Sequence, residues 1–156
     1  MRRLELALLL AVAALAAALL LLRARPGRPP SPYCRSGAPL AGVYHTDRLA
    51  VKRRCAVVSG VVTKVKFEAF DGDVHVDLRE DGGRVLVVEI IPQDRSVVAV
   101  PDTGMRVTVV GPLVDDLAHG WPEIHPAWWI SAGRIVPAST AELTRVESLL
   151  GHKEAR

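Results

Sequence analysis

Side chains that could do chemistry are concentrated in eleven residues of this chain, His119–Trp129, with the sequence HGWPEIHPAWW. The segment holds all three tryptophans of the protein, two of its five histidines and the carboxylate of Glu123. Imidazole and carboxylate groups can bind a divalent metal, transfer protons as general acid and base, or pair with each other through hydrogen bonds. The segment is therefore the first candidate for a functional site.

A second polar segment, Asp71–His75, has the sequence DGDVH and is predicted to turn the chain into a strand. Alternation along that strand places Asp73 and His75 on one side and Val74 on the other. The same alternation places Glu123 and His125 on one side of their strand. If the two segments meet, their polar side chains converge. The candidate residues for ligand binding, or for a hydrogen-bonded clasp between the segments, are Asp71, Asp73, His75, His119, Trp121, Glu123 and His125.

Three interpretations of this set remain open. The groups could hold the two segments together by hydrogen bonds alone, bind a ligand or partner without metal, or bind Zn²⁺ or another divalent ion. The candidate metal ligands are Asp73, His75, His119, Glu123 and His125. The chain has no G-x-S-x-G, Walker, H-E-x-x-H or C-x-x-C motif, which favours a binding module over an enzyme.

The elements that position these residues are predicted to be mainly strands. Apolar, β-branched runs bounded by turn residues indicate five of them. They are expected at residues 55–70, 73–78, 84–91 and 105–111, and within 123–136. Asp71-Gly72-Asp73 and Asp81-Gly82-Gly83 supply turns, and Gly60 is expected to bend or bulge the long first strand. In that strand Val57, Val61, Val65 and Phe67 share one parity.

A helix is predicted to close the chain. Ser139 and Glu142 form a capping box, and the apolar stripe that follows is Leu143, Val146, Leu149 and Leu150, with Gly151 ending the helix. Five strands with a long, bent first member predict an all-β OB-fold-like barrel of five strands with a short C-terminal helix. A β-sandwich is the alternative, but it usually needs about seven strands.

In an OB barrel the loop between strands one and two and the loop between strands four and five flank one binding face. These loops correspond to residues 71–75 and 119–125. The fold therefore predicts that the two polar segments meet in space, although they are far apart in the sequence.

The N-terminus indicates export. Arg2 and Arg3 precede Leu6–Leu22, which contains only Leu, Ala and Val and would span about 26 Å as a helix. Such a segment is either a retained signal anchor or a cleaved signal peptide. The predicted organisation is a signal helix at 1–22, a Pro/Arg-rich linker at 23–33, the barrel at 34–137, the helix at 138–151 and a tail at 152–156.

Cysteine and charge distribution support this setting. Cys34 and Cys55 are the only cysteines, and such a pair outside the cytosol usually forms a disulfide, although two unrelated buried thiols are the alternative. Residues 1–30 hold five Arg and one Glu, which leaves 15 basic and 16 acidic residues in the rest of the chain. A nearly neutral domain argues against nucleic acid as the partner. The expected location is the cell membrane with the domain on the extracytoplasmic side, or secretion if the N-terminal segment is cleaved.

The chain also resembles a group of exported bacterial OB-fold proteins of uncharacterised function. The resemblance covers roughly residues 43–131. It is carried by YH at 44–45, RL at 48–49, Cys55 before VVSGVV, DGDVH at 71–75, LVVEIIP at 86–92 and GPLVDDLAHGWPEIHP at 111–126. It implies the fold and an exported setting, and no activity. The N-terminal helix would be the link to the membrane, and the expected partner of the domain is an unidentified protein or small molecule.

A fainter likeness points to the thermonuclease family, another OB barrel, in which an Asp-Gly-Asp turn after strand one supplies a calcium ligand. Residues 71–73 occupy the corresponding turn, but the third strand has arginine only at its start and residues 117–123 contain none. The chain thus lacks parts that the thermonuclease mechanism needs. Independently of that likeness, the cluster of histidines and carboxylates gives the alternative function, a metal-dependent hydrolase of phosphodiesters. It would use His75, His119 and His125 with Asp73 or Glu123 as ligands.

Overall fold

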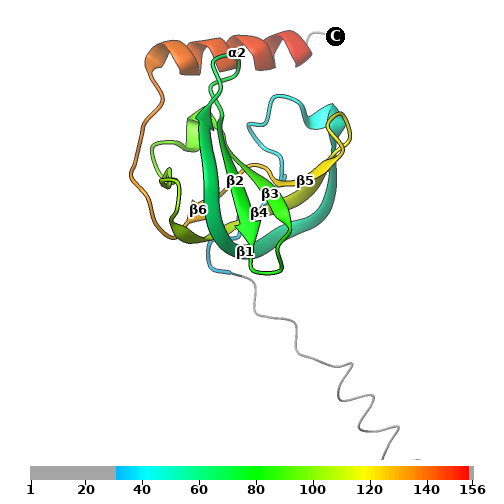
Figure 1. Cartoon of the computed structure of the whole chain (residues 1–156). Helices are drawn as coiled ribbons and strands as arrows, with labels where there is room; N and C mark the ends of the chain where they lie inside the picture. Colours follow the sequence, from blue (N-terminus) through cyan, green and yellow to red (C-terminus); the bar gives the residue numbers. More distant parts are fainter. Residues whose placement is uncertain (1–30, 155–156) are drawn as a thin grey trace, which may run out of the picture. The chain divides into compact units, whose positions relative to one another are not determined.

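The computed structural model describes residues 31–154 of the 156-residue chain (Figure 1). The predicted signal helix and most of the predicted linker lie outside the described residues. Across residues 31–154 no helix has the length and apolar character needed to cross a membrane.

The described chain is mostly β-sheet with one C-terminal α-helix, which confirms the all-β prediction at that level. Its elements in order are η1 Thr46–Arg48, β1 Leu49–Phe67, β2 Val74–Glu80, β3 Val85–Ile90, η2 Pro92–Asp94, β4 Arg106–Asp116, β5 Trp121–Ile124, β6 Trp129–Ile130 and α2 Thr140–Glu154.

Five strands form a closed ring in the order β1-β2-β3-β5-β4, which β4 completes by pairing with the N-terminal part of β1 (Figure 1). Every pairing in the ring is antiparallel except β3 with β5, which run parallel. The short β6 adds to β4 outside this ring. Because β5 lies between β3 and β4, the chain around residue 123 is brought beside β3, far from it in sequence.

The first strand is longer than predicted. Most of its buried residues have even numbers, opposite in parity to Val57, Val61, Val65 and Phe67. It begins at Leu49 and ends at Phe67, and its buried residues are Leu49, Ala56, Gly60 and Val62. A register irregularity between Val62 and Lys64 reverses the alternation. Val57, Val61, Val65 and Phe67, which share one parity in the sequence, therefore do not form a common buried face, and of these four Val65 packs against the core.

Gly60 has a different role from the predicted bulge. A Cβ at this position would lie 2.3 Å from the carbonyl oxygen of Arg79 on β2, so the two strands can approach only at a glycine.

The other strand boundaries also differ. β4 extends beyond the predicted Gly111 to Asp116, and the predicted fifth strand is two short strands, β5 and β6. Inside the ring, Val74, Val76 and Leu78 of β2 pack with Leu86, Val88 and Ile90 of β3, as their alternation predicts. A second, smaller apolar cluster contains Val43, Leu49, Ile91 and Val114. It joins the N-terminal segment to the sheet.

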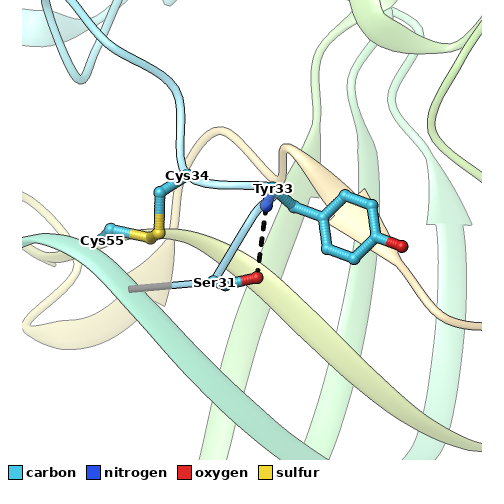
Figure 2. The surroundings of a disulfide bond; sticks show 4 residues. All are labelled: Ser31, Tyr33, Cys34 and Cys55. Carbon is cyan, nitrogen blue, oxygen red and sulfur yellow. Dashed lines mark hydrogen bonds between the residues drawn. A yellow bond between two sulfur atoms is a disulfide. The ribbon is translucent and has the colours of Figure 1, made fainter. Parts of the chain in front are cut away.

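The predicted disulfide between Cys34 and Cys55 is present, with the two Cα atoms 5.8 Å apart (Figure 2). It ties the start of the described chain to β1. Next to it the Tyr33 ring stacks on Trp129 with ring centroids 4.1 Å apart, and the backbone N–H of Tyr33 donates to Ser31 Oγ (3.3 Å). The last residues of the predicted linker thus lie against the β domain.

The helix α2 lies across one end of the ring (Figure 1). The predicted capping box is present: the backbone N–H of Glu142 donates to Ser139 Oγ (3.2 Å), and the N–H of Ser139 donates to Glu142 Oε2 (2.7 Å). The helix does not end at Gly151 but continues to Glu154. An exposed glycine costs only about 1 kcal/mol in a helix, which the surrounding turns can offset.

A buried arginine fastens this helix to the strands. Arg95 donates to the carbonyl oxygens of Val136 (3.0 Å) and Gly72 (3.2 Å) and to Glu142 Oε1 (2.6 Å). Its guanidinium also lies over the Phe67 ring, 5.2 Å from the centroid. One side chain therefore links the turn after β1, the segment before α2 and the first turn of α2.

Acidic pH is expected to weaken the contact between Arg95 and α2 by protonating Glu142. Hydrogen bonds from the Ser139 backbone and from Arg95 lower the pKa of Glu142 from 4.5 to about 2. A carboxyl with a lower pKa in the folded protein adds stability above its unfolded pKa, and that stability is lost as the pH falls from about 4.5 to about 2. We expect E142Q to be less stable than the natural protein near neutral pH and to lose less stability across this acid range. Urea unfolding followed by circular dichroism at several pH values measures both effects. E147Q, at an exposed position of the same helix, is the matched control, and an equal acid response in E142Q and the natural protein would contradict the assignment.

Candidate functional site

The two polar segments meet, and a residue of a third strand joins them. His125 follows β5, and its Nδ1 lies 3.0 Å from Glu89 Oε2 on β3 and 3.4 Å from Glu123 Oε2. His75 on β2 places its Nε2 3.4 Å from the other oxygen of the same carboxylate, Glu89 Oε1. The carboxylate of Glu89 therefore lies between the two imidazoles.

Strand register explains this convergence. His75 is directly opposite Glu89 in the antiparallel β2–β3 pair. In the parallel β3–β5 pair Val87 is opposite Glu123, so the next residues on the same face are Glu89 and His125. Val88 and Ile124 on the other face belong to the main core. The polar row thus lies on the face of the sheet opposite the core.

A close approach of two segments holds His125 in place. A Cβ at Gly111 of β4 would lie 2.5 Å from both the Pro126 carbonyl oxygen and a side-chain carbon of Ile124. The backbone N–H of His125 donates to the carbonyl oxygen of Pro112 (3.2 Å). Glycine at 111 is therefore needed for the chain around His125 to lie against β4.

The cluster is buried and rich in carboxyl groups. Asp73 is 7% exposed, Glu89 3%, Glu123 0% and His125 3%, whereas the side chain of His75 is 30% exposed. Asp73 Oδ2 lies 3.8 Å from His125 Nε2. Three carboxyl groups thus surround one buried imidazole.

Burial and neighbouring charge set the protonation of these groups. Burial would lower the pKa of His125, but hydrogen bonds to Glu123 and Glu89 outweigh it and raise that pKa to about 10. Burial likewise opposes ionisation of Glu89, yet the hydrogen bond and charge of His125 lower the pKa of Glu89. Burial, followed by the charge of Asp71, raises the pKa of Asp73 well above its usual value. Near neutral pH the cluster therefore contains an imidazolium and an ionised Glu89, while its surroundings disfavour ionisation of Asp73.

His119 lies apart from the other histidines. Its Nδ1–H donates to Asp116 Oδ2 (2.7 Å), which also lies 3.0 Å from Arg48 Nε. Burial opposes ionisation of Asp116, but the hydrogen bond from His119 and those from backbone N–H groups lower its pKa. The structure thus places His119 with a different carboxylate, contrary to a single set with His75 and His125.

Trp121 connects this pair to the central cluster. Its indole stacks on the His119 ring at 4.6 Å between centroids, and its Nε1–H donates to Glu123 Oε1 (2.6 Å). Asp71 has a local role, since its Oδ1 accepts from the backbone N–H of Asp73 (3.2 Å) and so holds the turn.

A groove of about 500 Å³ runs beside the cluster, over the outer surface of β1, β2, β3 and β5. It combines lysines, acidic groups and an imidazole with apolar and indole surface. The lining residues are Lys64, Lys66, Glu68, His75, Asp77, Val85, Val87, Trp121 and Pro122. His75 and Trp121 belong to both the groove and the polar network.

Glu89 and Asp116 are the principal residues that the sequence analysis missed. Each had a signal. Glu89 is the only charged residue in the apolar run of β3, on the parity opposite Leu86 and Val88. Asp116 shares the parity of Val114, but β4 was expected to end before both.

No protein-family model matches the chain, and no curated protein matches it either.

Proposed function

We propose that this chain is a binding module of the OB-fold type whose ligand lies in the groove over β1, β2, β3 and β5. The ring order β1-β2-β3-β5-β4, with its parallel β3–β5 pair, supports this fold. OB folds bind ligands on the face of strands two and three, between the loops that follow strands one and four. The groove lies on that face, which is the observation that carries the proposal.

The chemistry of the groove favours a small anionic ligand with an apolar or aromatic part. Lys64 and Lys66 supply positive charge, although Lys66 pairs with Glu68 at 2.5 Å. Val85 and Trp121, which are 53% and 44% exposed, supply apolar and stacking surface. A nucleic acid is a weaker candidate than a small ligand with a single anionic group. It would need a continuous basic groove, whereas the domain is nearly neutral and the groove also contains the carboxylates of Glu68 and Asp77.

Anilinonaphthalene sulfonate, an aromatic anion, is a suitable first probe of this groove. We expect saturable binding to the natural protein, and we expect K64E to weaken it by about threefold to tenfold, because the reversal replaces an attraction with a repulsion at an exposed site. Probe fluorescence measures the affinity. K52E changes the same charge on β1 outside the groove, where Lys52 pairs with Asp115 at 2.8 Å, and should leave the affinity unchanged. Equal effects of the two substitutions would remove the groove from the proposal.

We further propose that the domain acts outside the cytosol, tethered by Leu6–Leu22 or released by cleavage. The disulfide and the apolar run support this setting. The resemblance to exported OB-fold proteins agrees with it. Sedimentation with membranes that resists carbonate extraction would identify a retained anchor, and a soluble product without residues 6–22 would identify a cleaved signal.

The second candidate, a metal-dependent hydrolase, is favoured by one observation. Nε2 of His125 is buried with no hydrogen-bond partner among the described residues. The predicted ligand set that joins His119 to His75 and His125 is not supported, because the His119 imidazole pairs with Asp116. Glu89 would have to take its place.

A further inference from the structure

We propose that Asp73, His75, Glu89 and His125 form a binding site for a divalent transition metal, with Zn²⁺ as the first candidate. This inference does not depend on the ligand of the groove. It replaces the predicted set that contained His119 and Glu123, and it adds Glu89.

The spacing of the ligand atoms suits such an ion. Asp73, His75 and Glu89 can each offer an atom, with all three atoms within 4.8 Å of one another. His75 Nε2 and Glu89 Oε1 are 3.4 Å apart, and His125 Nε2 and Asp73 Oδ2 are 3.8 Å apart. Metal–ligand bonds of about 2.0 Å in a tetrahedron separate the ligand atoms by about 3.3 Å. Both pair distances are close to that separation. The group of ligand atoms that lie within 4.8 Å of one another does not include His125, so its imidazole would have to shift toward His75 and Glu89 when an ion binds.

The orientation of His125 is the independent observation. Its Nδ1 faces the carboxylates of Glu89 and Glu123, at 3.0 and 3.4 Å. Its Nε2 is buried, has no hydrogen-bond partner among the described residues and faces Asp73. Metal-binding histidines commonly have this arrangement, in which a carboxylate accepts a hydrogen bond from one ring nitrogen and the other nitrogen faces the ion.

The balance between buried acidic and basic groups also supports a bound cation. Three buried carboxyl groups, from Asp73, Glu89 and Glu123, face the single buried imidazole of His125. Buried charges are stable only when they are paired or bind a metal. A divalent cation would satisfy the carboxylates, and two imidazole and two carboxylate ligands suit Zn²⁺ better than Mg²⁺ or Ca²⁺.

Glu123 would be a positioning residue. One of its oxygens accepts from Trp121 Nε1–H (2.6 Å) while the other faces His125 Nδ1. His75 is half-buried and lines the groove. A metal ion bound to His75 would therefore lie at the edge of the groove, where a ligand bound in the groove could reach it.

The test uses the full-length chain, purified without a histidine tag and stripped with a chelator. Zn²⁺ titration by calorimetry should show one saturable site, and Co²⁺ should give the visible absorption of a tetrahedral site. D73N and H75N should each weaken binding by more than about 100-fold, and E123Q by about 10- to 100-fold. H119N and K52E should leave Zn²⁺ affinity within about twofold, since neither residue is in the proposed set or lines the groove.

Three results would overturn the proposal. The natural protein could bind no Zn²⁺ saturably, or D73N and H75N could bind it unchanged. Loss of binding in H119N but not in H75N would move the metal to Asp116, His119 and Glu123, whose ligand atoms also lie within 4.8 Å of one another. Circular dichroism of each metal-free variant separates loss of a ligand from loss of the fold. The groove is tested separately, because probe binding in the metal-free protein would persist if the metal proposal failed.

Discussion

Replacing His125 by alanine is expected to lower the free energy of unfolding by about 3–5 kcal/mol in the metal-free protein, the usual cost of removing one partner of a buried ion pair. The substitution leaves Glu89 and Glu123 buried, 3% and 0% exposed, without the imidazolium that compensates them. Guanidinium unfolding near neutral pH measures the loss. H119A is the control: that side chain is 44% exposed, and its removal should cost about 1 kcal/mol or less. A loss in H125A no larger than in H119A would mean that the buried carboxyl groups do not need the imidazole.

The effects of His75 and His125 should also be coupled. Both imidazoles contact Glu89, so the double alanine variant should lose less stability than the sum of the single variants, by about 0.5–3 kcal/mol. Repeating the cycle with added chelator and with Zn²⁺ separates a hydrogen-bonded clasp from a metal site. Strictly additive losses in both conditions would mean that the two segments do not act as one cluster.

Loss of the disulfide is expected to cost about 3 kcal/mol. The bond joins residues 21 positions apart, and closing a loop of this length removes about that much conformational free energy from the unfolded chain. The variant with serine at both Cys34 and Cys55 should unfold at a lower denaturant concentration, and reductant should reproduce the shift in the natural protein. Reductant should have no effect on the double serine variant, which is the control.

Thiol titration tests the same bond in the exported protein. Denatured, unreduced protein should contain no free cysteine. Two free thiols, or a stability loss below about 1 kcal/mol on reduction, would contradict the structural role of the bond and would remove much of the support for an extracytoplasmic domain.

Local patterns in the sequence predicted most of the elements. The alternation of Val74, Val76 and Leu78 sets the buried face of β2 because successive side chains of a strand point to opposite sides. Ser139 and Glu142 predict the start of α2 because their hydrogen bonds involve neighbouring residues only. The boundaries of β1 and β4 were less predictable. The pairing of Leu49 with Asp116 extends both strands, and such a pairing depends on residues distant in the sequence.

The candidate site divides in the same way. The sequence alone determined the polar parity of Asp73 with His75 and of Glu123 with His125, and it supplied the only two cysteines that could form the disulfide. Only the tertiary structure decided which carboxylate each imidazole contacts. The parallel pairing of β3 with β5 places Glu89 between His75 and His125. The turn after β4 instead brings His119 into hydrogen-bonding contact with Asp116. The physical reason is that periodicity determines which face a side chain occupies, while the register between strands, set by how the whole ring closes, determines its neighbours on that face.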